Sequence, residues 1–507
     1  MKLFEVSWEV CNKVGGIHTV ITSKMLNAQK SFKEYFLIGP YFKDKADKVF
    51  VEEELPKEFE YLNNLEFKVR FGTWKTKGEP KVFLIEYKNL FGSVNDYKKY
   101  FWEHNEVDSL FCAYDFEEPM VFSWAVSRLL EEVSKQEKIL THFHEWMCGF
   151  AGLRLKNEGL NAKVIFTTHA TLLGRSIASN FDLYKELKDI DDMQWARKLN
   201  VLDKHTAEKA CAKYSDVFTT VSNITKKEAK ILLKRDPLVT PNGIDVNNYK
   251  DFRCVLEDYF VNPLKDFIDY STDLKSRPLV LFLSGRYEHK NKGVDLIIDG
   301  LDKIRSELTS KHKDVVFFFL LAMDNFALKK EFVKKKKDFH EGVKLQNNSA
   351  ICTHECFLDI ERDLKNKGFD NSGKLKIFVI PSYLDGYDGL FDKSYEEVVS
   401  FADLGVFPSF YEPWGYTPME SVCLGVPSIT TNLSGYGDFM KKFDGKGVHI
   451  INRNNYEKAV EDFSMLVLDY AKLDDLDLLK KKIEARELYK KTSWDNLYKY
   501  YLKAYNS

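Results

Sequence analysis

Two cations near the middle of the chain are spaced so that both could contact one diphosphate. Arg286 and Lys292 follow an apolar run that predicts a buried strand, and Gly293 comes directly after them. Positive charge at such a place would neutralise the charge that develops on a diphosphate as it leaves a sugar. An ion pair on the protein surface is the alternative interpretation of the same residues.

The segment from Pro408 to Glu420 is dense in aromatic residues, prolines and acids. Glu412 lies between aromatic residues and before a proline, in a loop that is predicted to follow a strand. A bound ligand explains a carboxylate there better than local structure does. The end of the segment also has a structural explanation, with Thr417 as the N-cap of a helix, Pro418 in its first turn and Glu420 completing a capping box.

A glycine pair follows the first predicted strand. Lys13 comes shortly before Gly15 and Gly16, and a helical pattern begins near Ile17. Paired glycines let the backbone approach a ligand closely, and the N–H groups at the start of a helix bind phosphate. The motif therefore predicts a phosphate contact, to which Lys13 could add a cation. A plain strand-to-helix turn would need the same glycines.

Two further motifs combine histidine with charged side chains at the ends of predicted strands. His142, His144 and Glu145 lie close together in the sequence, which suggests metal binding, acid–base work or a role in orienting the active site. A packed histidine and a helix cap by Glu145 are the alternatives. His169 follows the next predicted strand, with Arg175 shortly after it. This pair could contact a sugar hydroxyl and a phosphate, respectively.

The elements that must position these side chains are short apolar runs that alternate with helical patterns along the whole chain. Most runs are continuously apolar, which is typical of strands buried on both faces of a parallel sheet. The predicted strands are Leu3–Val6, Tyr35–Ile38, Val82–Glu86, Ile139–Phe143, Val164–Thr168, Val217–Val221, Leu279–Ser284, Val315–Leu321, Lys376–Ile380, Gly405–Pro408, Ser428–Thr431 and Val448–Ile451. Two such sets predict an α/β fold with two doubly wound, Rossmann-like domains, whose ligands bind at the carboxyl ends of the strands.

The domain boundary is expected between Pro241-Asn242-Gly243, which is a turn signal, and Arg277-Pro278. The expected parts are an N-terminal domain over residues 1–245, a second domain over 246–475 with a helical insertion at about 324–373, and a helical segment over 476–507. Within the insertion, the Lys334–Lys337 run is interpreted as a solvated helix face.

Composition excludes several classes of protein. Hydrophobic residues make up 44% of the chain and charged residues 30%, as in globular proteins. The net charge of −2 gives no reason to expect binding to nucleic acid or to an acidic membrane. Neither the N-terminus nor the scattered cysteines indicate export, so we expect a cytoplasmic protein with reduced thiols. Cys352, His354 and Cys356 could bind zinc, but no fourth ligand lies nearby, and an ordinary loop is the preferred interpretation.

Together these strings resemble the family 3 glycosyltransferases, the eukaryotic-type glycogen synthases. The matching strings follow the family's order and are Glu5–Val10 with Asn12–Gly16, His142–Trp146, Phe166–Arg175, Val217–Val221, Thr240–Gly243, Ser284–Gly293, Val406–Pro418 and Asn432–Gly435. The resemblance implies the GT-B architecture, with two Rossmann-like domains facing a central cleft. It also implies transfer of glucose from UDP-glucose or ADP-glucose to the non-reducing 4-hydroxyl of glycogen or another α-1,4-glucan. Retention of configuration is implied too, without a cofactor or metal.

The resemblance also implies roles for particular residues. Glu412 and Glu420 are similar to the two acids of an E-x7-E signature and would contact the donor glucose and the nucleotide ribose. The other implied donor contacts are His169 at the glucose, Arg175 at a phosphate, Arg286 and Lys292 at the diphosphate, Lys13 with Gly15 and Gly16 over the nucleotide sugar, and Trp414, Gly415 and Thr417 at glucose hydroxyls and phosphate. The expected catalytic residues are Glu412, His169, Arg286 and Lys292. The residues expected to orient the site are His144 and Glu145.

The sequence departs from the eukaryotic members of this family near its C-terminus. Those enzymes carry an Arg-rich helix that senses glucose 6-phosphate, whereas the matching stretch here, Lys480–Lys491, has one arginine and interspersed glutamates. We therefore expect an enzyme without that regulation. A homo-oligomer and a glycogenin-like primer are further expectations. The alternatives are another retaining GT-B transferase and a catalytically inactive glucan-binding scaffold, and the choice between UDP and ADP stays open.

Overall fold

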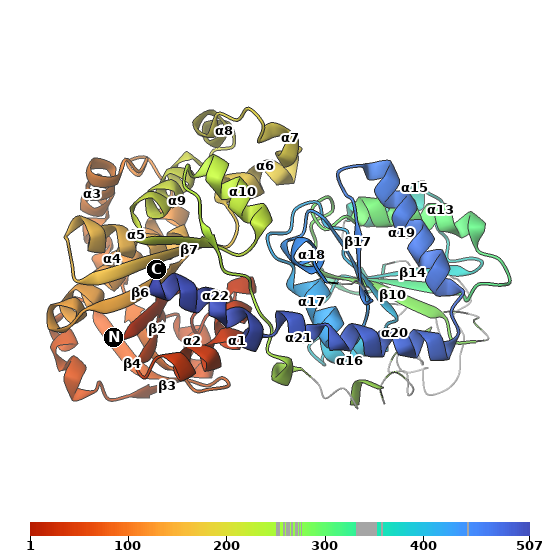
Figure 1. The fold of residues 1–507 in the computed structure, drawn as a ribbon, viewed down its shortest axis with the longest axis horizontal. Coiled ribbons are helices and arrows are strands. Elements are labelled where there is room, and N and C mark those ends of the chain that lie inside the picture. The colour runs from red at the N-terminus through yellow and green to blue at the C-terminus, as the bar shows by residue number, and fades with distance from the viewer. Residues whose placement is uncertain are drawn as a thin grey trace. The chain divides into compact units, whose positions relative to one another are not determined.

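The computed structural model of the chain forms two compact units, each with one large sheet flanked by helices (Figure 1). The first unit consists of Met1–Asp245 with Ser493–Ser507, and the second of Val246–Thr492. The described residues are 1–249, 254–256, 259, 264, 267–268, 272, 274, 276–330, 352–355, 358–443 and 446–507.

The sheet of the first unit has the strand order β3-β4-β5-β2-β1-β6-β7-β8-β9. The strands are β1 (Leu3–Val6), β2 (Tyr35–Pro40), β3 (Phe50–Glu53), β4 (Lys68–Trp74), β5 (Lys81–Glu86), β6 (Ile139–His144), β7 (Ala162–Thr168), β8 (Val217–Thr220) and β9 (Leu238–Val239). Neighbours from β5 to β9 are parallel, whereas β4 is antiparallel to both β3 and β5. All strands predicted for this half are present. The sequence does not predict β3, β4 and β9. Charged residues interrupt the apolar pattern of β3 and β4 at this partly exposed end of the sheet, and β9 has only two residues.

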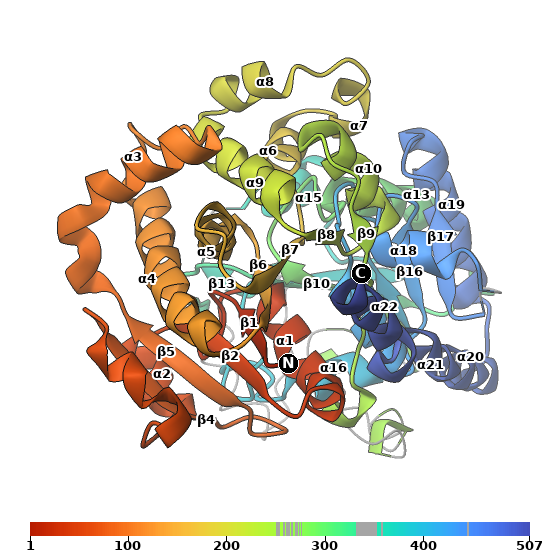
Figure 2. The ribbon, with the colours of Figure 1, turned by 60° about the vertical axis from the view of Figure 1, so that its left-hand side comes forward.

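Helices cover both faces of this sheet, as the alternating side chains of β1 show. Phe4 and Val6 join the core that α4 and α5 close, whereas Glu5 points to the opposite face, toward Lys24 of α1. On that face α22 lies beside α1 in both views (Figure 1 and Figure 2). The helices are α1 (Gly16–Ser31), α2 (Lys43–Val49), η1 (Lys57–Asn64), η2 (Lys88–Ser93), α3 (Val94–Asn105), α4 (Tyr114–Gln136), α5 (Trp146–Asn157), α6 (Leu172–Asn180), α7 (Leu183–Glu186), α8 (Asp192–Lys198), α9 (Leu202–Tyr214), α10 (Asn223–Leu232) and α22 (Trp494–Asn506).

The second unit contains a fully parallel sheet with the order β14-β11-β10-β15-β16-β17. Its strands are β10 (Leu279–Arg286), β11 (Val315–Ala322), β14 (Leu375–Ile380), β15 (Leu404–Val406), β16 (Ser428–Thr431) and β17 (Val448–Ile451), with β12 (Ala327–Leu328) and β13 (His354–Glu355) paired separately. Its helices are η3 (Val246–Asn248), α13 (Val294–Glu307), α15 (Asp359–Asn366), α16 (Tyr395–Phe401), α17 (Tyr416–Cys423), α18 (Gly435–Met440), α19 (Tyr456–Ala471), α20 (Asp475–Glu487) and α21 (Tyr489–Thr492). All strands predicted for this half are present.

The expectation of one helical segment over 476–507 is wrong. α20 and α21 belong to the second unit, whereas α22 belongs to the first. The physical reason is the aromatic face of α22, where Trp494, Tyr498 and Tyr501 are buried. The indole N–H of Trp494 donates to Ser23 Oγ of α1 at 2.7 Å, which anchors α22 on the first sheet.

The expected insertion at about 324–373 contains strands as well as a helix. Its described residues form the antiparallel pair of β12 and β13, followed by α15. Cys352 and His354 lie on or next to β13 rather than in a plain loop, while Cys356 lies outside the described residues. The Lys334–Lys337 run also lies outside them.

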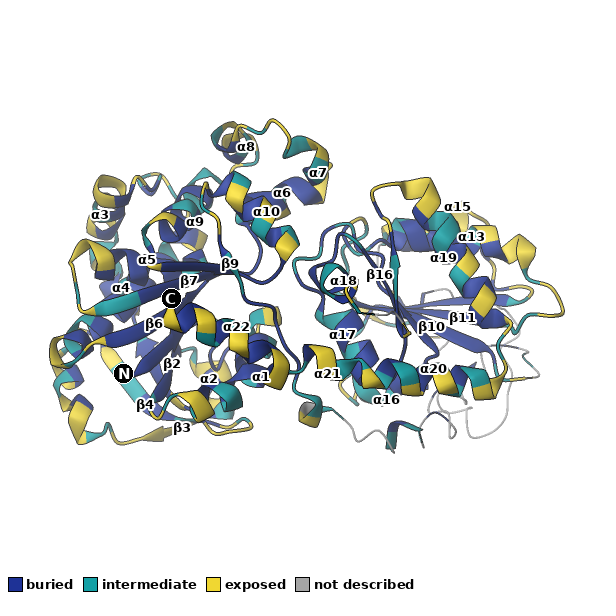
Figure 3. Cartoon of the chain, in the orientation of Figure 1, coloured by how far each residue is buried: buried dark blue, intermediate teal, exposed yellow. Residues whose placement is uncertain are grey.

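The central strands are the most deeply buried part of each unit (Figure 3). In β10 and β11, the residues from Leu279 to Leu283 and from Val315 to Leu321 are all buried. Burial on both faces requires an uninterrupted apolar run, which explains why these strands can be predicted from sequence. In the described part of the chain, no helix has the length and apolar character to cross a membrane.

Candidate active site

The strand orders place the predicted site residues at the points where each sheet changes its winding direction. In the first sheet, the chain runs outward from β1 through β2 to β5, and then from β6 through β7 to β9 on the other side. In the second sheet, β10 is followed by β11 and β14 on one side and by β15, β16 and β17 on the other. Ligands of doubly wound folds bind at the carboxyl ends of the strands at these points. His144 ends β6, His169 follows β7, Arg286 ends β10, and Glu412 comes after β15.

Lys292 and Glu412 form an ion pair in the second unit. Lys292 Nζ lies 2.5 Å from Glu412 Oε2, and the two side chains are only 16% and 19% exposed. Gly293 makes this approach possible, because a Cβ there would lie 2.3 Å from the carbonyl oxygen of Pro408. Partial burial strengthens the attraction between the two charges relative to water. The structure thus brings together two side chains, one predicted to contact the diphosphate and the other predicted to contact the donor sugar.

Arg286 lies at the end of β10, on the same strand-to-helix connection as Lys292. Its side chain is 64% exposed, and its guanidinium is 3.8 Å from Glu288. A surface ion pair of this length contributes little to stability. The Arg286 guanidinium is therefore positioned to accept an anionic partner without breaking a strong internal contact.

The loop that carries Glu412 and Trp414 is held by the start of α18. The backbone N–H groups of Gly435 and Tyr436 donate to the carbonyl oxygens of Glu412 and Trp414, at 2.9 and 2.7 Å. The hydroxyl of Ser434 also donates to Trp414, at 3.0 Å. Because these contacts use the backbone of the loop, they leave the Glu412 carboxylate oriented toward Lys292.

The predicted N-cap at Thr417 is wrong. The N-cap lies two residues earlier, at Gly415, with φ at +111°, and α17 begins at Tyr416. Only glycine adopts this φ without strain, so the loop can turn directly into the helix there. Glu420 therefore does not complete a capping box, and its carboxylate accepts a hydrogen bond from the hydroxyl of Tyr249 at 3.2 Å.

In the first unit, Glu145 holds the backbone at His169. Glu145 Oε1 accepts the N–H of His169 at 2.8 Å, and Glu145 itself has a φ of +64° and makes no side-chain cap at the start of α5. Glu145 is thus the N-cap residue of α5, but its carboxylate binds the backbone at His169 and makes no cap hydrogen bond. Burial raises the pKa of Glu145 to about 7, against the hydrogen bond from His169 and the charge of Arg175, which lower it. Arg175 is exposed near the start of α6.

Glu9, which the motif analysis did not single out, occupies the start of α1. Its Oε2 atom accepts the backbone N–H groups of Gly15 at 2.7 Å and His18 at 3.0 Å. These donors belong to the helix N-terminus that the sequence predicts as a phosphate contact. Lys13 and Gly16 are exposed beside them. A phosphate at this place would have to share these N–H groups with Glu9 or displace its carboxylate.

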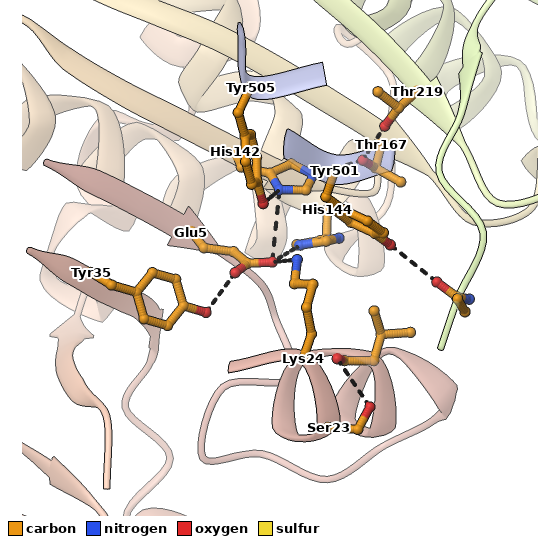
Figure 4. Close-up of polar contacts among 12 residues, drawn as sticks. Glu5, Ser23, Lys24, Tyr35, His142, His144, Thr167, Thr219, Tyr501 and Tyr505 are labelled. Atoms are coloured by element: carbon orange, nitrogen blue, oxygen red, sulfur yellow. Dashed lines mark hydrogen bonds and ion pairs between the residues drawn. The ribbon is translucent and has the colours of Figure 1, made fainter. Parts of the chain in front are cut away.

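A buried polar network is centred on Glu5 of β1 (Figure 4). Glu5 Oε1 is paired with Lys24 and lies 2.6 Å from His144 Nε2, while Glu5 Oε2 accepts the hydroxyl of Tyr35 at 2.6 Å. The other ring nitrogen of His144, Nδ1, lies 2.9 Å from His169 Nε2. The structure therefore connects His144 to His169 through a hydrogen bond. Glu5 and Lys24 were missed because each is an isolated charge in its local sequence.

The same network contains the histidines that the sequence analysis considered as metal ligands. Glu5, His142 and His144 are the described residues close enough together to hold an ion. Their donor atoms already have partners, because His142 is bonded to Tyr505 and Thr167 and both ring nitrogens of His144 are used. The Lys24 ammonium beside Glu5 would also repel a cation. The donor set fits a hydrogen-bonded network rather than a metal site.

Comparison with known proteins identifies the family. The sequence matches the family model for glycogen synthase over residues 5–348 and 322–507. It is 32% identical to the liver glycogen [starch] synthase of Rattus norvegicus, over 89% of this chain and 75% of that protein. It is 30% identical to glycogen [starch] synthase isoform 1 of Saccharomyces cerevisiae, over 99% of this chain and 85% of that protein.

The fold is similar to that of solved GT-B glycosyltransferases. One of these is the catalytic domain of starch synthase IV from Arabidopsis thaliana, bound to ADP and acarbose. The TM-score is 0.62 at 15% identity, and the match covers 100% of this chain and 98% of that one. The sequence and fold comparisons agree with the family and the fold that the motifs indicate. The chain belongs to the glycogen synthase family of glycosyltransferases.

Proposed function

We propose that this glycogen synthase moves glucose from a nucleoside diphosphate donor to the non-reducing 4-hydroxyl of an α-1,4-glucan, with retention of configuration. The observation that carries the proposal is the ion pair of Lys292 with Glu412, 2.5 Å apart at the carboxyl edge of the second sheet. A diphosphate leaving group needs cations next to the bond that breaks, and the donor glucose needs a hydrogen-bond acceptor beside them.

In the proposed reaction, the bond between the sugar C1 and the diphosphate oxygen breaks, and negative charge grows on the departing phosphate. Lys292 and Arg286 stabilise that charge. The 4-hydroxyl of the acceptor attacks from the same face and passes its proton to the departing phosphate. The contribution of the protein is charge, orientation and exclusion of water, so no metal or cofactor is required.

The positive charge of Lys292 is compensated by an ion pair before the donor binds. Its charge is compensated by Glu412 in a site where both side chains are largely buried. An incoming diphosphate supplies a second anion for Lys292, and Glu412 can then turn its carboxylate toward the sugar hydroxyls. This exchange would link donor binding to the orientation of Glu412.

A matrix of donors and acceptors tests the proposal. Purified protein is supplied with UDP-glucose or ADP-glucose, and with glycogen, maltooligosaccharides or monosaccharides, and nucleotide release is measured. We expect release with glycogen and maltooligosaccharides, a preference for one nucleotide, and a product whose new linkage is α by proton NMR. Transfer to monosaccharides alone, or no release with any donor, would refute the proposal.

Metal independence is tested in the same assay. We expect full activity after exhaustive EDTA treatment, because the proposed chemistry uses only side-chain cations. Loss of activity that Mg²⁺ or Mn²⁺ restores would contradict this part of the proposal. A glycogenin-like primer, a homo-oligomer and a cytoplasmic location stay predictions, since they rest on the family resemblance and the amino-acid composition.

A further inference from the structure

The hydrogen-bonded chain from Glu5 through His144 to His169 determines where the protons lie. Glu5 Oε1 lies 2.6 Å from His144 Nε2, and His144 Nδ1 lies 2.9 Å from His169 Nε2. Glu5 and His144 have fully buried side chains, so water does not compete for these bonds. A neutral imidazole has one donor nitrogen and one acceptor nitrogen, so the protonation of one member dictates that of the next.

The first link is fixed by the charge of Glu5. Burial alone would raise the pKa of this carboxyl, but the Lys24 ammonium and the hydrogen bond from His144 lower it well below its usual value. Glu5 is therefore an ionised acceptor. The hydroxyl of Tyr35 and the ammonium of Lys24 also donate to it. His144 Nε2 must consequently carry a proton.

The proton positions on His144 Nδ1 and on His169 follow if both imidazole rings are neutral. Burial lowers the pKa of His144, against the hydrogen bond and the charge of Glu5, which raise it, and the charge of Lys24 adds to the lowering. Burial also lowers the pKa of His169 well below its usual value, with the charges of His144, Lys24 and Arg175 acting in the same direction and that of Glu5 against it. With its proton on Nε2, neutral His144 offers Nδ1 as an acceptor. His169 Nε2 must then be the donor in the bond between the two rings. This leaves His169 Nδ1 without a proton.

We propose that Glu5 and His144 are positioning residues that keep His169 neutral with its proton on Nε2, so that Nδ1 is an obligate acceptor for a hydroxyl of the donor sugar. His169 keeps 9% of its surface exposed, and no bond of its Nδ1 is found among the described residues. The ligand part rests on the proposed function, whereas the proton positions do not.

Neutrality of His169 suits the proposed reaction. As the glycosidic bond breaks, positive charge develops on the sugar ring, and an imidazolium beside it would raise the energy of that state. A neutral ring that only accepts a hydrogen bond avoids this penalty. It also selects a sugar that presents a hydroxyl at that place, because an acceptor cannot bind another acceptor.

The experiment reads the proton directly. The ligand-free protein is labelled with nitrogen-15 histidine, and His169 is assigned by comparison with a His169→Asn variant. We expect the nitrogen signature of a neutral ring protonated at Nε2, unchanged across the pH range in which the protein is folded. A ring protonated at Nδ1, or a charged ring near neutral pH, would overturn the proposal.

Three variants separate the relay from general packing. His144→Phe removes both bonds, so we expect His169 to populate both neutral forms. His144→Asn keeps an oxygen near the Nδ1 position and should preserve more of the Nε2-protonated form, which is the test if His144→Phe fails to fold. Tyr35→Phe removes a bond to the other oxygen of Glu5 and should leave His169 unchanged. An unchanged His169 signature in His144→Phe would refute the relay, and so would loss of the Nε2-protonated form in His144→Asn.

Activity supplies the second readout. We expect His144→Phe to lower kcat by about tenfold, the lower end of the range for partners that orient metal-binding histidines. A donor that lacks the accepted hydroxyl should lose this dependence, so a series of deoxyglucose donors identifies the hydroxyl. An equal loss with every deoxy donor would contradict the assigned role of Nδ1. If no donor is turned over at all, the proposed function fails, while the NMR result still decides the relay.

Discussion

The candidate site residues of the first unit and those of the second unit are held in place by different means. In the first unit, Glu5 and Lys24 are fully enclosed, and hydrogen bonds run from strand to strand until they reach His169. In the second unit, Arg286 is mostly exposed and the pair of Lys292 and Glu412 is partly exposed. The loops there are positioned by backbone contacts and by glycines, not by buried charges.

This difference suggests different tasks for the two units. A buried charged network cannot change partners without leaving an unpaired ion, so it keeps one arrangement. Lys292 and Glu412 can each bind another partner when an anion arrives, because both side chains are partly exposed to solvent. The first unit is thus suited to fix the orientation of His169, and the second to respond to charge that appears during the reaction.

Breaking the buried network should have the largest effect on stability. Lys24→Met removes the cation beside Glu5 and should lower the free energy of unfolding by about 3–5 kcal/mol, because a buried carboxylate is left uncompensated. Urea denaturation followed by circular dichroism measures the change. Lys303→Met, at an exposed position on α13, is the matched control and should be near neutral. Adding Glu5→Gln to Lys24→Met should restore part of the loss. A loss as small as in the control would contradict the network's structural role.

Removing the exposed guanidinium of Arg286 in the second unit should lower turnover and leave folding intact. Arg286→Ala is expected to lower kcat by at least roughly a hundredfold, since it removes one charge that stabilises the leaving diphosphate. Its unfolding midpoint should match that of the unmodified protein, because the side chain is 64% exposed. Lys303→Ala serves as the control for removal of a lysine or arginine charge elsewhere. Near-normal turnover of Arg286→Ala would refute its assignment.

A buried acid of the first unit should make its stability depend on pH. Burial raises the pKa of Glu208 to about 8, with the charge of Glu145 acting in the same direction. The folded chain therefore holds this proton at a pH where the unfolded chain has lost it, and stability falls as the pH rises from about 5 to 8. Glu208→Gln, which can still accept the N–H of Leu172, should weaken that fall. If the unfolding free energy of Glu208→Gln and that of the unmodified protein changed with pH at the same slope, the raised pKa of Glu208 would be contradicted.

The smallest expected effect is that of glucose 6-phosphate, which should not activate the enzyme. Lys482 is fully buried on α20, where its ammonium donates to the carbonyl oxygens of Ser400 and Ala402. Among the exposed lysines, Lys480 pairs with Asp477 and Lys490 with Glu487, whereas the ammonium of Lys491 lies over the ring of Phe443. These partners leave no strong cluster for a phosphate.

A turnover assay at subsaturating donor, with glucose 6-phosphate as the titrant, measures this. The same titration with inorganic phosphate controls for nonspecific anion effects. A saturable increase of several-fold that only the sugar phosphate produces would show that the second unit contains a sensor.

The fold, and the closeness of the charged residues in the second unit, are the parts that the sequence indicates most directly. Strands buried on both faces need uninterrupted apolar runs, and the predicted runs all became strands. Arg286, Lys292 and Glu412 stand in two short segments next to such strands, so their types and spacing indicate a shared task. The start of α17 was misjudged because its N-cap depends on the positive φ of Gly415, which composition does not reveal.

The buried network of the first unit was decided by tertiary structure. Glu5 and Lys24 carry no local signal, and the two become partners only because α1 packs on the face of the sheet to which Glu5 points. Tyr505 reaches His142 because α22 returns to the first unit from the end of the chain. Sequence determined the two sheets, the motifs at their strand ends and the family, because these depend on local pattern. Strand order and helix packing decided which distant charges share one buried network, because such a network is stable only when every member has its partner.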